Sequence, residues 1–294
     1  MKFVVAAFCL FASLSAQSLQ VDATGTLMLT WQGSGAVQTV STPVQGSTTL
    51  SNSGVGLITL STGTTTTLTL QPYSPPWPGP VQGWWSQASA DVVLRYSASS
   101  AAAGVLRISA VPSCMMGMPP SVDVEDDGFY ELPPSGLPST VDIPVVLGPR
   151  PVPIRIQGTS VNFGASCLST IEVSFVPQPS KLVTTGVACG SSLAASLLPP
   201  STQPGRFTLH VDDLQMPANV LAAVVFGRTA LPLGVTCGPG LVVDGSFLRV
   251  PTAGGFDFPI PLSAGLVGTL ELQNVGLQLP LLLQYSNRVQ ISLP

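Results

Sequence analysis

Charged side chains and histidine are scarce in this sequence. Of its 294 residues only 8% are Asp, Glu, Lys or Arg, and His210 is the single histidine. Acid–base catalysis and most metal centres depend on these side chains. His210 alternates with Phe207, Leu209 and Val211, which predicts a strand histidine that faces solvent. No Gly-x-Ser-x-Gly motif is present. We therefore assign no catalytic residue and predict that the protein is not an enzyme.

Clusters of Lys and Arg are also missing, and the net charge is -4. Such clusters are what phosphate backbones and anionic lipid surfaces require. The Gly-rich segment Gly33-Ser-Gly lacks the following Lys of a phosphate-binding loop. The sequence thus predicts no nucleic-acid partner and no cofactor.

Apolar runs long enough to cross a bilayer are absent, but a shorter one stands near the first residue. Lys2 precedes the apolar run Phe3–Leu14, and small and polar residues follow it. This order is typical of a secretory signal peptide, with cleavage predicted near Ala16. The later stretch Val220–Phe226 is too short for a membrane helix and predicts a buried strand. We expect a signal peptide over residues 1–16 and a protein that is secreted, extracellular or at the cell surface, without membrane insertion.

Cysteines are few, and none has the Cys-x-x-Cys spacing of a zinc site. Apart from Cys9 in the predicted signal, four remain, an even number that suits structural disulfides in an oxidising compartment. Four cysteines allow three pairings. We favour Cys114 with Cys167 and Cys189 with Cys237, because each bridge then stays on one side of the connector Pro177–Ser180. Each would close a loop of about 50 residues, worth roughly 4 kcal/mol on a chain-entropy estimate.

Turn residues are plentiful and evenly spread. The chain has 29 Gly and 29 Pro, and between them lie short runs of alternating apolar residues. No long stretch keeps the 3.6-residue period of a helix, so the pattern predicts an all-β fold. The clearest alternations are Leu27/Leu29/Trp31, Val92/Leu94/Tyr96, Val141/Ile143/Val145, Ile171/Val173/Phe175, Phe207/Leu209/Val211, Phe256/Phe258/Ile260 and Val289/Ile291.

The length favours two domains over one. We place the boundary at the Pro-Gln-Pro-Ser connector Pro177–Ser180. This gives an N-terminal β-sandwich over residues 17–178 and a C-terminal one over residues 181–294, each immunoglobulin-like or jelly-roll-like and with its own core. The Ser/Thr-rich segment Thr39–Thr67 is punctuated by apolar residues and predicts strands with one polar face.

The second segment also carries a family resemblance. Its motifs are Thr185-Gly-Val-Ala-Cys-Gly, Phe207-Thr-Leu, Val225-Phe-Gly, Phe258-Pro-Ile-Pro, Leu266-Val-Gly, Leu272-Gln and Ser286-Asn-Arg-Val. In these the chain resembles the C-terminal module of uncharacterised secreted β-sandwich proteins of planctomycete-type bacteria. The resemblance implies an exported β-module with a cysteine pair at Cys189 and Cys237, and it implies no activity.

An acidic stretch is the sharpest candidate for metal binding. Asp123, Glu125 and Asp127 stand at alternate positions before Gly128, as in the first half of a calcium loop, and Glu131 could fill the ninth loop position. Pro134 stands where a bidentate acid is expected. The alternative interpretation is an acidic hairpin turn, because apolar residues precede and follow Asp-Asp-Gly.

A proline-stiffened segment gathers three of the four tryptophans. Tyr73, Trp77, Trp84 and Trp85 lie within it. Aromatic rings held by a stiff loop can stack on the faces of sugars, which makes this segment a candidate ligand-binding loop. The alternative, which we favour, is that the rings fold under the loop and cover the end of the sandwich.

Two functional classes follow from these features. We expect a non-enzymatic structural or adhesive protein of the cell exterior, because strands with few charged residues suit a protein that packs against other surface proteins or matrix. The alternative is a carbohydrate-binding module that holds extracellular polysaccharide through Trp77, Trp84 and Trp85. A glycan-active hydrolase is a distant third.

Overall fold

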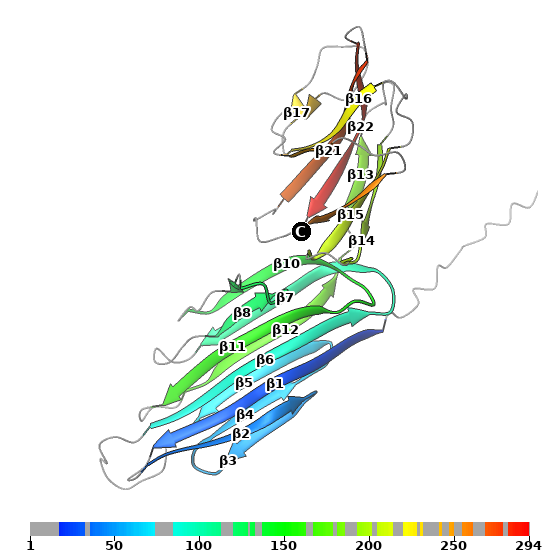
Figure 1. Cartoon of the computed structure of the whole chain (residues 1–294). Coiled ribbons are helices and arrows are strands. Elements are labelled where there is room, and N and C mark those ends of the chain that lie inside the picture. Colours follow the sequence, from blue (N-terminus) through cyan, green and yellow to red (C-terminus); the bar gives the residue numbers. More distant parts are fainter. Residues whose placement is uncertain are drawn as a thin grey trace, which may run out of the picture.

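The computed structural model confirms the all-β prediction. It describes residues 18–32, 36–73, 85–112, 120–128, 130–132, 137–162, 167–178, 181–185, 193–201, 205–213, 220–227, 230–231, 241–242, 247–249, 255–260, 268–278 and 282–293. Within these ranges the regular structure is antiparallel β-sheet, and no helix there is long and apolar enough to cross a membrane. Figure 1 shows a large lower lobe and a smaller upper one. We call them the first lobe (Leu19–Pro177) and the second lobe (Lys181–Leu293).

The first lobe is a sandwich of two six-stranded sheets. Sheet A has the order β2-β1-β6-β11-β8-β9. Its strands are β1 (Leu19–Gln32), β2 (Val37–Gln45), β6 (Trp85–Ala98), β8 (Ser121–Val124), β9 (Tyr130–Leu132) and β11 (Val152–Asn162).

Sheet B has the order β10-β7-β12-β5-β4-β3. Its strands are β3 (Thr48–Asn52), β4 (Gly56–Ser61), β5 (Thr65–Pro72), β7 (Ala102–Pro112), β10 (Ser139–Leu147) and β12 (Ser169–Pro177). The polar-faced strands predicted for Thr39–Thr67 are therefore present, because β2 to β5 occupy this region.

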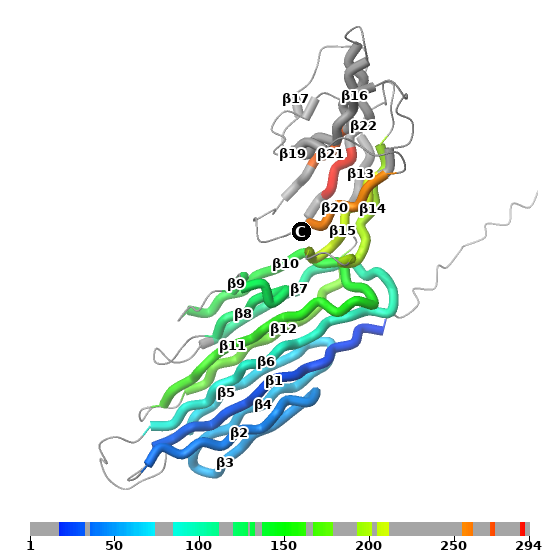
Figure 2. Tube along the Cα trace, in the orientation of Figure 1, coloured from blue at the N-terminus to red at the C-terminus, as the bar shows by residue number. Residues whose placement is uncertain are grey.

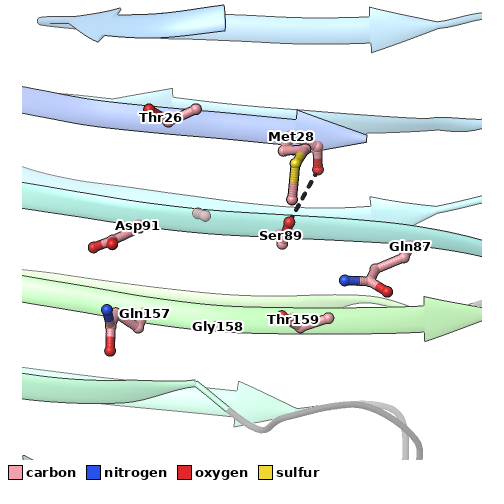
Figure 3. A pocket seen from close by; sticks show the side chains of 9 residues that line it. Thr26, Met28, Gln87, Ser89, Asp91, Gln157, Gly158 and Thr159 are labelled. Carbon is pink, nitrogen blue, oxygen red and sulfur yellow. Dashed lines mark hydrogen bonds between the residues drawn. The ribbon is translucent and has the colours of Figure 1, made fainter. Parts of the chain in front are cut away.

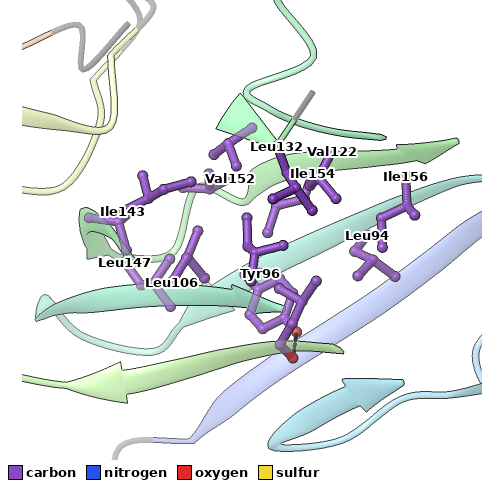
Figure 4. Packing of buried hydrophobic residues seen from close by; sticks show 14 of the residues in the cluster. Leu94, Tyr96, Leu106, Val122, Leu132, Ile143, Leu147, Val152, Ile154 and Ile156 are labelled. Atoms are coloured by element: carbon purple, nitrogen blue, oxygen red, sulfur yellow. Dashed lines mark hydrogen bonds between the residues drawn. The ribbon is translucent and has the colours of Figure 1, made fainter. Parts of the chain in front are cut away.

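Alternation along each strand explains why these residues form a sandwich. In β11 every second residue is buried, and β6 shows the same two-residue period. Side chains of period two point to opposite faces of a sheet, so one face of each sheet is apolar. The two apolar faces meet in the core that Figure 4 shows around Tyr96. Leu94, Leu106, Ile143 and Ile154 are labelled members of the same cluster.

The second lobe is built from smaller sheets. A five-stranded sheet has the order β13-β22-β21-β16-β19, a three-stranded sheet the order β14-β15-β20, and β17 pairs with β18. The strands are β13 (Lys181–Thr185), β14 (Leu193–Leu198), β15 (Phe207–Asp213), β16 (Val220–Gly227), β17 (Ala230–Leu231), β18 (Leu241–Val242), β19 (Phe247–Arg249), β20 (Phe256–Ile260), β21 (Gly268–Gln278) and β22 (Leu282–Leu293).

The two lobes have separate sheets but adjoining cores. Among the strands that the structure describes, every pairing joins two strands of the same lobe, and β12 ends at Pro177 before β13 begins at Lys181. Figure 2 shows the strands of the first lobe in the same orientation. Buried apolar residues of both lobes nevertheless belong to one continuous cluster. At the junction the Val146 N–H donates to the Arg206 carbonyl at 3.3 Å.

Several predicted features lie outside the described residues. These are the signal peptide over residues 1–16 and three of the cysteines, Cys114, Cys189 and Cys237. Cys167 is described and buried, with its Sγ 3.1 Å from the Val161 carbonyl oxygen. The two proposed disulfides and their connectivity stay predictions.

Candidate functional site

The acidic stretch forms a tight hairpin turn between β8 and β9. Asp123 is only 3% exposed, and its two carboxylate oxygens accept the backbone N–H groups of Asp127 at 3.2 Å and Gly128 at 2.9 Å. Glu125 and Asp126 have φ angles of 83° and 53°, in the left-handed region that turns use. The Asp123 carboxylate therefore organises the turn by bonding its backbone.

Glu131 closes the same turn and joins it to the second lobe. One of its oxygens accepts the Val124 N–H at 2.7 Å, and the other pairs with the guanidinium of Arg206. Arg206 is 1% exposed. Burial lowers the pKa of Arg206, while the nearby carboxylates of Glu125, Asp127 and Asp123 oppose that shift. Sequence reasoning missed Arg206, because a partner so distant along the chain leaves no local pattern.

Burial also acts on the carboxylates of the turn. It raises the pKa of Glu125, against the attraction of Arg206, and it raises the pKa of Asp123, against the two backbone N–H groups that the carboxylate accepts. Glu125, Asp126, Arg150 and Gly205 line a cavity of about 310 Å³ at the junction of the lobes.

The calcium hypothesis concerns Asp123, Glu125, Asp127 and Glu131. The structure brings all four into one turn, with Asp123 bound to backbone N–H groups and Glu131 bound to a backbone N–H and Arg206. Within the described ranges, no group of three or more His, Cys, Asp or Glu residues is arranged to hold a metal ion. Calcium binding by this turn stays a hypothesis.

The candidate aromatic loop is described only at its two ends. Trp77 and Trp84 lie outside the described residues. Tyr73 is half-buried, and its carbonyl oxygen accepts the Ser86 hydroxyl at 2.8 Å. Trp85 is the first residue of β6, where its indole N–H donates to the Gln32 side chain at 2.8 Å. Sugar binding by this loop and covering of the end of the sandwich both stay predictions.

His210 lies on β15 and pairs across the sheet. Its Nδ1 is 2.5 Å from a carboxylate oxygen of Asp257 on β20, which is its register partner. The histidine is half-exposed and Asp257 is exposed. The pair thus lies at the surface of the three-stranded sheet and stabilises the pairing of β15 with β20.

The outer face of sheet A carries a groove of about 300 Å³. It crosses β1, β6 and β11, and Figure 3 shows its lining. At one side Asp91 accepts both a 3.0 Å and a 2.9 Å hydrogen bond from the Arg155 guanidinium. This contact lowers the pKa of Asp91. No sequence motif predicts this groove, because the residues that line it come from three separate strands.

The free edge formed by β2 and β3 is a second surface that sequence reasoning did not locate. These strands end sheets A and B, and Figure 1 places them on the side of the first lobe away from the second lobe. No Asp, Glu, Lys, Arg or His occurs between Asp22 and Asp91, so both edge strands are free of charge. The long gap between charged residues, from Asp22 to Asp91, is the feature of the sequence that could have indicated this edge.

No family model, no curated protein and no solved structure matches this chain. The resemblance to planctomycete-type secreted modules stays a prediction.

Proposed function

We propose that this chain is a non-enzymatic structural or adhesive protein of the cell exterior, and that it associates with further copies of itself through the uncharged edge of β2 and β3. The observation that carries the proposal is the absence of any charged side chain from Ala23 to Ala90, the segment that forms both strands of this edge.

Edge strands present unpaired backbone N–H and C=O groups that can pair with another chain. Soluble proteins usually block such edges with charges, bulges or a covering element. The opposite edges of the two sheets follow that rule. On β9, Glu131 pairs with Arg206 of the second lobe. On β10, Asp142 makes an exposed ion pair with Arg107.

On the β2 and β3 edge the protection is slight. Val37 is 53% exposed, and Thr39, Ser41 and Thr49 are exposed. Pro43 is the single residue of this edge that cannot donate a backbone N–H. Every residue of the stretch Val37–Thr42 has a backbone N–H group, and those that point away from β1 can pair with another chain. Two copies of this stretch could pair antiparallel without like charges meeting. Such pairing would join the sheets of neighbouring molecules.

The test is to place charge on the edge. The double variant Ser41→Lys/Thr49→Lys keeps two exposed positions exposed but brings lysines together when two edges meet. We expect the unmodified protein to associate in a concentration-dependent manner in sedimentation velocity. The variant should weaken this association by at least about tenfold, which corresponds to about 1.4 kcal/mol.

Ser99→Lys/Ser100→Lys is the matched control. It adds the same charge at exposed residues of the turn between β6 and β7. It should associate like the unmodified protein. A protein that stays monomeric at every concentration, or an association that both double variants weaken equally, would refute the proposed role of this edge.

A further inference from the structure

The groove on the outer face of sheet A has an ordered floor and walls. Strand register aligns Met28, Ser89 and Thr159 in a row across β1, β6 and β11. Gln87 lies two residues to one side of this row, and Asp91 with its register partner Gln157 lies two residues to the other. Ser89 is a short side chain between longer ones, so the groove runs across the strands (Figure 3).

The size of the groove follows from sheet geometry. Three neighbouring strands span about 10 Å, and the walls at Gln87 and Asp91 are about 13 Å apart along β6. The lining residues come from three neighbouring strands, so an elongated molecule that lies in the groove would run across β1, β6 and β11.

The lining offers hydrogen-bonding groups that are neutral. Within the part of the chain that the structure describes, the Gln87 amide and the Thr26 and Thr159 hydroxyls have no protein partner. The Ser89 hydroxyl donates to the Met28 carbonyl at 3.3 Å and keeps its oxygen as an acceptor. Amides and hydroxyls that both donate and accept match the hydroxyl groups of sugars, and the Met28 side chain adds apolar surface for their C–H faces.

The one charged group of the lining is already neutralised. Asp91 accepts hydrogen bonds from Nε and Nη2 of Arg155, and the Gln157 side chain is a further hydrogen-bond partner. The groove thus presents no free positive charge for a phosphate, sulfate or carboxylate. A neutral ligand fits this environment better than an ionic one.

Aromatic rings stand beside the groove. Trp85 is two residues before Gln87 on the same face of β6, about 7 Å along the strand, and its N–H is fixed by Gln32. On the other side the Tyr130 hydroxyl lies 3.5 Å from the Gln157 side chain, and Tyr130 is 41% exposed. Rings with polar edges near neutral hydrogen-bonding groups are suited to stack on sugar faces.

We propose that this groove binds an uncharged polysaccharide chain. The bound chain lies across β1, β6 and β11, with its hydroxyl groups hydrogen-bonded to Gln87, Ser89 and Thr159. This activity is separate from the edge pairing of β2 and β3. It would let one protein hold both its own copies and the surrounding matrix.

Affinity electrophoresis tests the proposal with defined probes. The full chain is run in native gels that contain hydroxyethylcellulose, barley β-glucan, galactomannan or xylan, and in a gel with polygalacturonate. We expect retardation by at least one neutral polysaccharide and none by polygalacturonate. Ser89→Phe, which fills the groove from a half-exposed position, should weaken the retardation at least about tenfold.

Gln87→Ala is the second variant, since it removes an amide without adding bulk and keeps the test valid if Ser89→Phe folds poorly. Gln20→Ala is its matched control, because Gln20 is an exposed glutamine of β1 outside the groove. Gln20→Ala should be retarded like the unmodified protein. So should Thr49→Lys, which places charge on the β3 edge of sheet B and leaves Ser41, the register partner of Met28, unchanged. Failure of edge pairing would therefore leave this result unchanged.

Three outcomes would overturn the proposal. One is no retardation by any neutral polysaccharide, and another is retardation by polygalacturonate alone. The third is retardation that folded Ser89→Phe and Gln87→Ala retain but Trp84→Ala loses, which would assign the binding to the aromatic loop.

Discussion

Tyr96 places a hydroxyl group inside the apolar core of the first lobe. It is fully buried, and its oxygen lies 2.9 Å from the Val173 carbonyl and 3.0 Å from the Thr66 hydroxyl. The carbonyl can only accept, so Tyr96 donates its proton to Val173 and accepts one from Thr66. Burial raises the pKa of Tyr96 to about 12. The hydroxyl thus ties β6 of sheet A to β5 and β12 of sheet B.

Removing this hydroxyl should cost stability without changing the fold. Tyr96→Phe keeps the ring but leaves the buried groups of Val173 and Thr66 short of a partner. We expect a loss of about 1–3 kcal/mol in the free energy of unfolding, measured by chemical denaturation. A variant as stable as the unmodified protein would show that the two hydrogen bonds contribute nothing net.

Glu125 should make part of the stability depend on pH. Its pKa is raised above the ordinary value of 4.5, so the folded protein holds this proton to a higher pH than the unfolded chain does. Stability is therefore lost as the pH rises from about 4.5 through the folded pKa. Relative to the unmodified protein, Glu125→Gln should become more stable over this pH range, as measured by chemical denaturation at a series of pH values.

Asp142→Asn provides the opposite trend as a control. Arg107 lowers the pKa of Asp142, so its stabilising effect is present above pH 3.8 and disappears as the pH falls through the folded pKa. The effect is small because the pair is exposed to solvent. If the free energy of unfolding changed with pH in the same way for both variants, this would contradict the conclusion that burial raises the pKa of Glu125.

At the scale of elements, the acidic turn shows what local sequence can and cannot predict. Asp-Asp-Gly between apolar residues predicts a hairpin, and β8 and β9 form one. The apolar alternations predicted the strands in the same way, because the period of two is local. The order of strands in each sheet is not local. The groove depends on that order, so it could not be predicted from the sequence. The uncharged segment Ala23–Ala90 is visible in the sequence, but only the strand order shows that β2 and β3 form an edge.

Asp123→Ala tests the structural role of the turn carboxylate. The change leaves the N–H groups of Asp127 and Gly128 without their acceptor in a partly buried turn. We expect a loss of about 1–3 kcal/mol in the free energy of unfolding, together with faster amide hydrogen exchange in β8 and β9.

The same turn decides the calcium hypothesis. Because Asp123 and Glu131 are engaged with N–H groups and Arg206, we expect calcium titration of chelator-treated protein to show millimolar or weaker affinity. Micromolar affinity that Asp123→Ala abolishes would assign the turn to calcium instead.

For the whole molecule, the contact between the lobes is tight. Both lobes contribute to one apolar cluster, and Arg206 of the second lobe pairs with Glu131 of the first in a buried position. At the same junction a Cβ on Gly148 would lie only 2.5 Å from the ring of Pro199. The Pro177–Ser180 connector, by its composition, predicted two separate cores. It could not predict this interface, since the residues that form it are distant along the chain.

Arg206→Leu should separate the unfolding of the two lobes. The change leaves Glu131 buried without its cation, which typically costs about 3–5 kcal/mol. The unmodified protein should unfold in a single calorimetric transition because the lobes are coupled, and Arg206→Leu should unfold in two because each lobe keeps its own sheets.

Adding Glu131→Gln should restore part of the coupling, since the uncompensated charge is removed. Arg107→Leu breaks an exposed ion pair, so it should cost no more than about 1 kcal/mol and keep a single transition. Two transitions in the unmodified protein would show instead that the lobes unfold independently and that the Arg206–Glu131 pair does not couple them.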